Sequence, residues 1–372
     1  MSNFLKSKFF RTYFLPGFVF QSVVIAGGYG TGRELIEYFL SHGPLGGIYG
    51  MVVTTVVWGI VLAVTYDFVR VFKTYDYRSL FTQLLGKFWF LYEICYILLL
   101  FIVLAVVGAA AGNVVQDTFG IPYVIGVTVM LLGVAYLSYS GSRAIETYMS
   151  WWSFVLYGVY AAFIIFGLSR FGPSISQALS TREIIPGWGL DGFRYAFYNL
   201  GCICAILFTL PDIETRSEAF VSGFLSSLIT IIPGFLFYMV VLSGYPGIVS
   251  DTMPAFTALK SLGSVLLLAA YEIVLFGTLI ETGTGFIHAV NERLAATLKE
   301  RDRQLTKNMR GVIALGMVLL SIAMSRFGLI DLIAKGYGTI SWGFFITHIV
   351  PVLTIGIAKI VRAEKSQPPF PN

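Results

Sequence analysis

Four glycines and two oppositely charged residues interrupt a hydrophobic segment near the start of the chain. The run IAGGYGTGRELIEYF covers residues 25–39, and Arg33 and Glu34 directly follow its glycines. A glycine inside a helix costs about 1 kcal/mol relative to alanine. A charged side chain near the middle of a bilayer costs at least about 2.5 kcal/mol. A membrane segment that carries both costs is expected to have a function.

A helix that breaks at these glycines frees backbone groups that can bind a ligand. The N–H groups of a second half-helix starting near Thr31 favour a carboxylate, and the carbonyls ending the first half-helix near Ala26 favour a cation. Glycine permits the unusual backbone angles and the close approach of a solute. The alternative is that these glycines only allow neighbouring helices to pack tightly. The candidate solute-binding residues here are Gly28, Tyr29, Gly30, Thr31, Gly32 and Glu34.

Glu34 has two compatible candidate roles. The run TGRE has capping-box spacing, in which Thr31 caps the new helix and Glu34 folds back to the Thr31 N–H. The carboxylate also suits a solute amine or a coupling proton. Arg33 is expected to pair with a carboxylate such as Glu37. The run lacks the Lys and Ser/Thr of a P-loop and the third glycine of a dinucleotide fingerprint, so both nucleotide sites are excluded.

A second polar group lies in the apolar run YEIVLFGTLIETGTGFIHAVNERL, residues 271–294. Glu281, Thr284 and His288 share one helical face, with Thr282 beside it. Carboxylate and hydroxyl oxygens can complete a small cation site with carbonyls of the first segment. Glu281 can instead carry a proton, or form a structural pair with an Arg or His. The candidate ion-coupling residues are Ala26, Glu281, Thr282 and Thr284, and no other metal site is expected.

The composition identifies the kind of protein that must position these residues. Of the 372 residues, 56% are hydrophobic and 12% charged, with a mean hydropathy of +0.79. Soluble proteins carry about 25% charged residues, so we expect an all-α integral membrane protein. The apolar runs long enough to cross a bilayer lie near 12–40, 44–70, 88–116, 121–138, 146–169, 191–210, 219–243, 264–290, 310–326 and 338–361.

About ten spans divide into two halves of five that enter the membrane from opposite sides. Such inverted repeats are common in secondary transporters, whose binding sites lie at broken helices in corresponding positions. The sixth span contains a weaker break signal, with Tyr198, Asn199 and Gly201 as further candidate solute-binding residues. We therefore expect a single transmembrane domain over 1–372, with repeats at 11–171 and 190–361 and broken first and sixth helices.

Basic residues predict the orientation. Most of the 25 Lys and Arg residues fall in segments that share one side if the N-terminus is cytoplasmic. An even number of spans then places both termini in the cytoplasm, and we expect the cell (inner) membrane as the location. Cys95, Cys202 and Cys204 lie in apolar runs without metal-ligand spacing, so we interpret them as buried hydrophobes.

Three of these motifs resemble a known family. AGGYGTGRELIEYF, the YNL at 198–200 and ETGTGFIHAVNERL look like corresponding runs of the YkvI family of bacterial membrane proteins. That family is placed in the amino acid–polyamine–organocation transporter superfamily. The resemblance implies a LeuT-type five-plus-five fold, with a substrate between the first, third, sixth and eighth helices.

The expected function is ion-coupled secondary transport of a small amino-acid-like or zwitterionic solute by alternating access. Four aromatic residues are available to line a cavity, namely Tyr29, Tyr92, Tyr96 and Tyr198. The alternative is a solute-sensing receptor subunit without coupled transport, because one fold serves many functions. An enzyme is not expected. The expected partners are the solute and the lipid bilayer, not nucleic acid, with Na⁺ or H⁺ as coupling ion and no cofactor.

Overall fold

The computed structural model describes residues 7–25, 30–140, 142–299 and 303–366, and these form helices and turns without a β-strand. Seven described helices are long and apolar enough to cross a membrane. They lie within α6 (Pro44–Phe72), α8 (Phe90–Phe119), α10 (Ser142–Ser180), α12 (Arg216–Leu242), α14 (Val265–Lys299), α15 (Lys307–Ser325) and the series over 329–366. The predicted all-α membrane fold is confirmed.

Three predicted spans correspond to shorter or interrupted helices. These are α3 (Leu15–Ile25) with α5 (Arg33–Tyr38), α9 (Tyr123–Ser140), and α11 (Trp188–Leu200) followed by the 3₁₀ turns η3 (Ile203–Ala205) and η4 (Leu207–Thr209). The remaining short elements are α2 (Lys8–Tyr13), η1 (Leu40–His42), α7 (Tyr77–Leu85), η2 (Gly86–Phe88), η5 (Gly247–Ser250) and α13 (Pro254–Ser261). The first and sixth helices are therefore broken, as predicted.

One group of helices, called here the bundle, consists of α3, α6, α11 and α12. Helix α6 packs along both α11 and α12, and α12 also packs against α3. The indole of Trp58 on α6 donates to the Ala196 carbonyl of α11 at 3.1 Å. A Cβ added at Gly223 of α12 would overlap the backbone of Ala63 on α6, so the two helices touch at their main chains. The broken helix α11 thus packs against α6, and the broken helix α3 packs against α12, which itself packs on α6.

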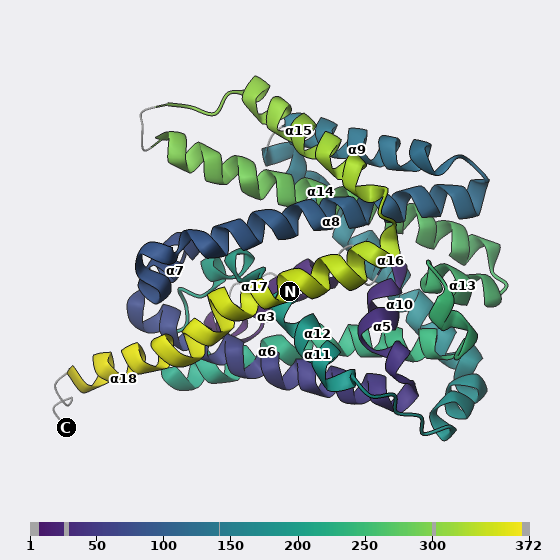
Figure 1. Cartoon of the computed structure of the whole chain (residues 1–372), viewed down its shortest axis with the longest axis horizontal. Coiled ribbons are helices and arrows are strands. Elements are labelled where there is room, and N and C mark those ends of the chain that lie inside the picture. The colour runs from purple at the N-terminus through teal and green to yellow at the C-terminus, as the bar shows by residue number, and fades with distance from the viewer. Residues whose placement is uncertain (1–6, 26–29, 141, 300–302, 367–372) are drawn as a thin grey trace.

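A second group, called here the scaffold, consists of α8, α9, α14 and α15, which pack on one another. In Figure 1, α9, α14 and α15 lie together along one edge and α8 separates them from the bundle. A Cβ at Gly126 of α9 would meet the Ala111 carbonyl of α8. The described scaffold helices run without the breaks seen in the bundle. They therefore offer a continuous helical surface against which the broken helices can form a site.

The C-terminal series crosses the molecule in front of the bundle, along the side of α8 that faces away from α9, α14 and α15 (Figure 1). It consists of α16 (Leu329–Asp331), the π-helical turns η6 (Leu332–Tyr337), η7 (Phe345–Ile349) and η8 (Val352–Gly356), and the helices α17 (Gly338–Phe344) and α18 (Ile357–Ser366). Turn η6 contacts α5, α8 and α11. Because π-helical turns occur often at functional sites, the approach of η6 to α5 marks that region for closer description.

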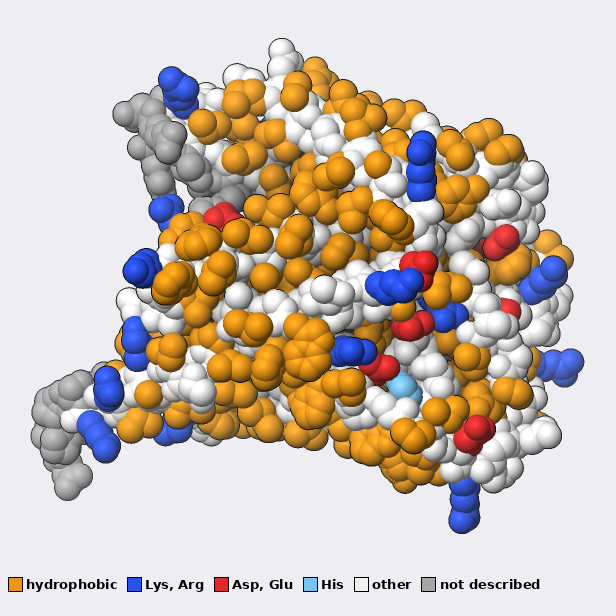
Figure 2. Space-filling view, in the orientation of Figure 1, with side chains coloured by type: hydrophobic (Ala, Val, Ile, Leu, Met, Phe, Trp, Pro, Cys, Tyr) orange, Lys and Arg blue, Asp and Glu red, His pale blue; other side chains and the backbone are white. Residues whose placement is uncertain are grey.

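Hydrophobic side chains cover most of the face in Figure 2, and Lys and Arg gather along its left edge. That edge carries α7 and α18 in Figure 1. Ion pairs join α2 and α18 to the segment before and at the start of α12: Arg11 bonds Asp212 at 2.8 Å, and Arg216 bonds Glu364 at 3.3 Å. The helices nearest the two chain ends therefore meet at one basic end of the molecule.

Candidate functional site

The first break separates α3, which ends at Ile25, from α5, which begins at Arg33. Gly32 precedes α5 with φ +75°, a left-handed conformation that glycine adopts without a steric penalty. Three of the predicted site residues lie outside the described residues, namely Ala26, Gly28 and Tyr29. Within the described chain, the left-handed turn at Gly32 marks the point where α5 begins.

The predicted capping box is wrong. The N-cap of α5 is Gly32, without a side-chain cap. The Thr31 hydroxyl accepts instead from the Arg33 N–H at 3.2 Å. The left-handed turn at Gly32 starts the helix one residue later than the TGRE spacing suggests. The Glu34 side chain therefore does not fold back to cap its own helix. Its carboxylate accepts a hydrogen bond from the Tyr198 hydroxyl at 2.5 Å.

The second break follows Leu200, where α11 gives way to 3₁₀ turns. Carbonyls at a helix end lack intrahelical partners and need others when buried. The Tyr92 hydroxyl donates to the Gly201 carbonyl at 2.7 Å, and His348 Nδ1 lies 3.2 Å from the Leu200 carbonyl. The Asn199 amide donates to the Tyr195 carbonyl one turn earlier at 2.9 Å. The end of α11 is thus held by side chains from α8 and η7.

The two breaks meet at a small buried space, called here the central cavity, of about 30 Å³. It is lined by Val23, Val24, Glu34, Leu99, Val103, Val107, Tyr198, Asn199, Cys202, Thr282, Phe286 and Tyr337. A water needs about 10–15 Å³ of such space, so the cavity is large enough for one. Five side chains with polar groups lie in otherwise mainly apolar walls: Glu34, Tyr198, Asn199, Thr282 and Tyr337.

Glu34 is buried, with 3% of its surface exposed. Its nearest cation along the chain, Arg33, is engaged elsewhere: the guanidinium bonds Glu37 at 2.8 Å and two carbonyls of the 249–251 segment. An uncompensated carboxylate in a protein interior costs several kcal/mol, and one neutral hydroxyl donor returns only part of that. The arrangement around Glu34 therefore favours its neutral form.

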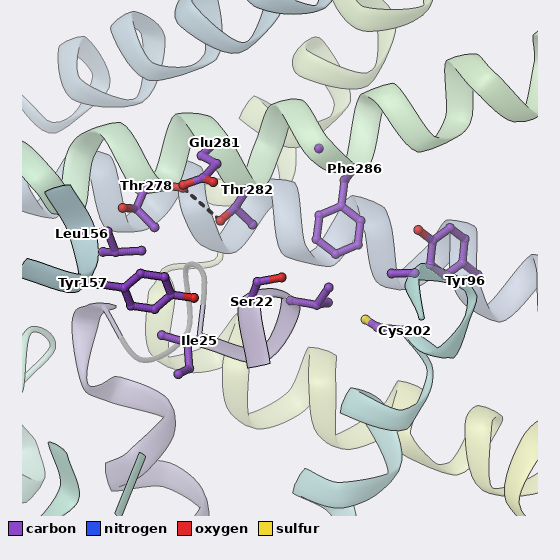
Figure 3. Close-up of a pocket in the computed structure, with 13 residues that line it drawn as sticks. Ser22, Ile25, Tyr96, Leu156, Tyr157, Cys202, Thr278, Glu281, Thr282 and Phe286 are labelled. Carbon is purple, nitrogen blue, oxygen red and sulfur yellow. Dashed lines mark hydrogen bonds between the residues drawn. The ribbon is translucent and has the colours of Figure 1, made fainter. Parts of the chain in front are cut away.

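A larger space, called here the α3-side cavity, adjoins the central one and measures about 240 Å³. The two share Val23, Cys202, Thr282 and Phe286 in their walls. In Figure 3, Glu281 and Thr282 on α14 lie across the cavity from Ser22 on α3, and Tyr157 on α10 closes one end. The Thr282 hydroxyl donates to the Thr278 carbonyl at 2.9 Å. Two of the predicted ion-coupling residues are thus brought together here.

The opposite side of the central cavity, called here the α5 side, is packed shut. Arg33 Nη1 donates to the Val249 and Asp251 carbonyls at 2.9 Å each, which fastens α5 to the segment before α13. Tyr198 and Tyr337 stack with ring centroids 4.6 Å apart. The site is therefore asymmetric, with side chains sealing one side and a cavity on the other.

Other predicted residues lie away from both cavities. Gly30 and Gly201 do not line them: a Cβ at Gly30 would meet Leu275 and Tyr160, and one at Gly201 would meet Phe344. Thr284 is buried, but the α14 residues in the cavity walls are its neighbours on a different face, including Glu281, Thr282 and Gly285. Its predicted place beside Glu281 in an ion site does not match the walls of the described cavities.

Several cavity residues were not predicted from the sequence. Tyr337, Phe286 and Tyr157 line the cavities, and Cys202, interpreted as a buried hydrophobe, lines both. Of the aromatic residues expected in a cavity, Tyr96 lines the α3-side cavity, whereas Tyr92 supports the second break instead. The run KGYG around Tyr337 is a local signal for an irregular helix beside the site.

No protein-family model and no curated protein matches the chain. Solved structures do match it over nearly its whole length. The structure of MhsT in complex with L-phenylalanine aligns with a TM-score of 0.57 at 16% identity, covering 94% of this chain and 98% of that one. A Na⁺-coupled sialic acid symporter in a substrate-bound outward-open state aligns with a TM-score of 0.51 at 10% identity, covering 99% and 97%. The chain is thus a multi-pass membrane protein with the LeuT-type fold.

Proposed function

We propose that this protein is an ion-coupled secondary transporter of a small amino-acid-like or zwitterionic solute. One observation carries the proposal. Two broken helices meet at a central cavity that is sealed on the α5 side and adjoins a larger cavity on the α3 side. Alternating access requires such a site between two sides that open in turn, and a rigid scaffold beside a broken bundle supports that movement.

The lining of the central cavity supports the solute class. Glu34, Tyr198 and Asn199 supply polar groups on the side of the two breaks, and Leu99, Val103 and Val107 of α8 supply an apolar wall. A solute with a compact polar head and a small apolar body satisfies both surfaces. The aligned MhsT structure holds L-phenylalanine. Because the central cavity measures only about 30 Å³, a solute of this class occupies it together with the adjoining α3-side cavity of about 240 Å³.

Glu281 and Thr282 are our candidates for the residues that bind the coupling ion. Both line the α3-side cavity, where a carboxylate and a hydroxyl offer the oxygen ligands that suit Na⁺, or where Glu281 can take a proton. The aligned symporter is Na⁺-coupled, which favours testing Na⁺ first. Because Thr284 does not line this cavity, we leave it out of the coupling group.

Further parts of the proposal concern the family and the membrane. The three quoted motifs support membership of the YkvI family. The basic end formed by α2, α7 and α18 supports cytoplasmic termini in the cell membrane. The two broken helices support inverted repeats over 11–171 and 190–361. The second candidate function, a solute-sensing receptor subunit, requires the same site without net movement of solute.

Binding is tested first, with purified protein in detergent. A thermal-shift screen covers amino acids, amines and betaines, each with and without Na⁺ and at two pH values. A ligand that raises the melting temperature is then supplied in radiolabelled form to proteoliposomes with an imposed Na⁺ or H⁺ gradient. We expect uphill accumulation that stops when the gradient is dissipated. Binding without gradient-driven accumulation would establish the receptor alternative instead.

Glu281→Gln is the informative variant, and Glu272→Gln is its matched control. Glu272 is a buried carboxylate on the same helix, α14, but it bonds Thr118 of α8 and lines neither cavity. Under proton coupling, Glu281→Gln binds solute independently of pH and fails to accumulate it. Under Na⁺ coupling, the variant loses Na⁺-dependent binding at every pH. Uphill accumulation equal to that of the unmodified protein would remove Glu281 from the mechanism.

A further inference from the structure

Glu34 and Tyr198 form a direct hydrogen bond between the two broken helices. Glu34 lies on α5 and Tyr198 lies in the last turn of α11, and the hydroxyl donates to Oε2 at 2.5 Å. Both side chains are buried and both line the central cavity. The bond therefore joins the discontinuous helices of the two halves at the solute site.

The surroundings of Glu34 are uncharged. The titratable groups that face it are Tyr38 on its own helix, Tyr198 of α11, Tyr337 of η6 and Cys202 after α11. The parts of α3, α8 and α14 that line the cavity contribute apolar side chains and Thr282.

The charged groups of the neighbouring elements are engaged elsewhere. Arg33 bonds Glu37 and the 249–251 segment. His42 of η1 bonds Asp191 of α11 at 2.8 Å, and Arg194 bonds the same carboxylate at 3.0 Å. Lys260 of α13 is exposed, and Lys335 of η6 pairs with Asp331 at 2.9 Å. No ion pair therefore compensates Glu34 among the described residues.

We propose that Glu34 is a proton-binding site of this protein, separate from Glu281, and that it holds its proton while α5 and α11 are closed against each other. In this arrangement Tyr198 donates to one oxygen of the neutral acid, and the other oxygen carries the proton. When α5 moves away from α11, water reaches the carboxyl, the O–H bond breaks, and the proton passes to a water as hydronium. Tyr198 keeps its own proton throughout.

The cavities supply a route for that proton. The central cavity has space for a water beside Glu34 and shares four lining residues with the α3-side cavity. Because Glu34 also faces the solute site, its protonation and the occupancy of that site affect each other. This last step rests on the proposed transport function, whereas the protonation of Glu34 in the closed arrangement does not.

Glu272 provides a comparison within the same molecule. It is a buried carboxylate that accepts a hydrogen bond from a hydroxyl, Thr118, at 2.5 Å. Its pair joins α14 to α8, two described helices that run unbroken in the scaffold. The chemistry of the two pairs is alike, but only the Glu34 pair spans helices expected to separate.

Infrared spectroscopy of the purified protein in D₂O, without solute, tests the protonation directly. A protonated carboxyl group gives a carbonyl stretching band that the ionised group lacks. We expect such a band near neutral pH, lost in Glu34→Gln and retained in Glu281→Gln. Tyr198→Phe should keep the band and shift it to higher frequency, because the acid loses a hydrogen-bond donor. Glu272→Gln, the control, should leave the Tyr198-sensitive band in place.

Two results would overturn the proposal. One is a Glu34→Gln spectrum identical to that of the unmodified protein at every pH, provided that the variant is monodisperse and helical. The other is a band that does not respond to Tyr198→Phe, which keeps the proposal testable if Glu34→Gln does not fold. If the band behaves as expected but no solute is transported, the proton site stands and the transport function fails. If transport occurs and Glu34→Gln moves as many protons per solute, the coupling role of Glu34 fails.

Discussion

The two helix breaks that form the site are built in different ways. At the first, the chain turns through Gly32 in a left-handed conformation, with φ +75°. At the second, Gly201 has ordinary right-handed angles, with φ −59° and ψ −20°. The first break therefore depends on the backbone freedom of glycine, and the second on the partners that surround it.

Those partners explain why a glycine is still required at the second break. A Cβ at Gly201 would lie against the ring of Phe344, closer than real Cβ contacts allow. The Gly201 carbonyl also needs the Tyr92 hydroxyl. At Gly32 a Cβ would sit 3.1 Å from Ala255 N and Pro254 Cγ, which is tight but less severe. Substitutions at Gly201, Phe344, Gly32 and Tyr92 test this difference between the two breaks.

The largest effect is expected for Gly201→Ala. The added methyl group must displace the buried Phe344 ring, and overpacking of this kind costs about 1–3 kcal/mol. Chemical unfolding in detergent measures the loss. Gly316→Ala on α15 is the matched control, because a Cβ there meets no atom within 4 Å, and removing a helical glycine should gain up to about 1 kcal/mol.

A second substitution at Phe344 shows whether contact is the cause. In the Gly201→Ala background, Phe344→Leu should recover part of the loss, because it removes the ring that the methyl group displaces. If the double variant loses the sum of the two single effects, the two sites act independently and the contact explanation of the second break is wrong.

At Gly32 the expected loss is smaller and has another origin. Gly32→Ala places a side chain in the left-handed region, at a cost of about 1–2 kcal/mol. Asparagine adopts that region more readily than alanine, so Gly32→Asn should be the more stable variant by thermal unfolding. At Gly201 the order should reverse, because asparagine is larger and the angles are ordinary. Equal melting temperatures for the two Gly32 variants would show that contact with α13 governs this site as well.

This difference between the two breaks also explains how well each could be predicted from the sequence alone. The first break is encoded locally, by four glycines beside two charged residues, and its described part, the left-handed turn at Gly32, lies within the predicted run. The second depends on Phe344 and Tyr92, which lie over a hundred residues away along the chain, so Asn199 and Gly201 gave only a weak signal. That signal located the break correctly without revealing its cause.

The cavity residues follow the same rule. Glu34, Tyr198, Asn199 and Thr282 were predicted because polar groups in an apolar run are conspicuous. Tyr337 was missed because its approach depends on how the C-terminal series crosses the bundle. On α14, the face chosen by periodicity passed through Thr284, whereas the cavity is lined by the strip through Thr278, Glu281, Thr282 and Gly285. Helical spacing shows which residues share one face of a helix, but it does not show which helix or cavity that face contacts.

The smallest expected effect tests the support of the second break. Tyr92→Phe removes the hydroxyl that bonds the Gly201 carbonyl, and a hydrogen bond of this kind contributes about 1 kcal/mol. Tyr238→Phe is the matched control, since its hydroxyl donates to the Pro44 carbonyl at 2.8 Å within the bundle. Both variants should lose similar stability, but only Tyr92→Phe should loosen the chain after α11.

The mobility of that chain is measured at Cys202, which follows the break and lines both cavities. The measurement is the rate at which a thiol reagent labels Cys202 in a protein whose Cys95 and Cys204 are replaced by serine. We expect faster labelling in Tyr92→Phe alone; equal rates in the two variants would mean that the Tyr92 bond stabilises the fold without setting the geometry of the second break.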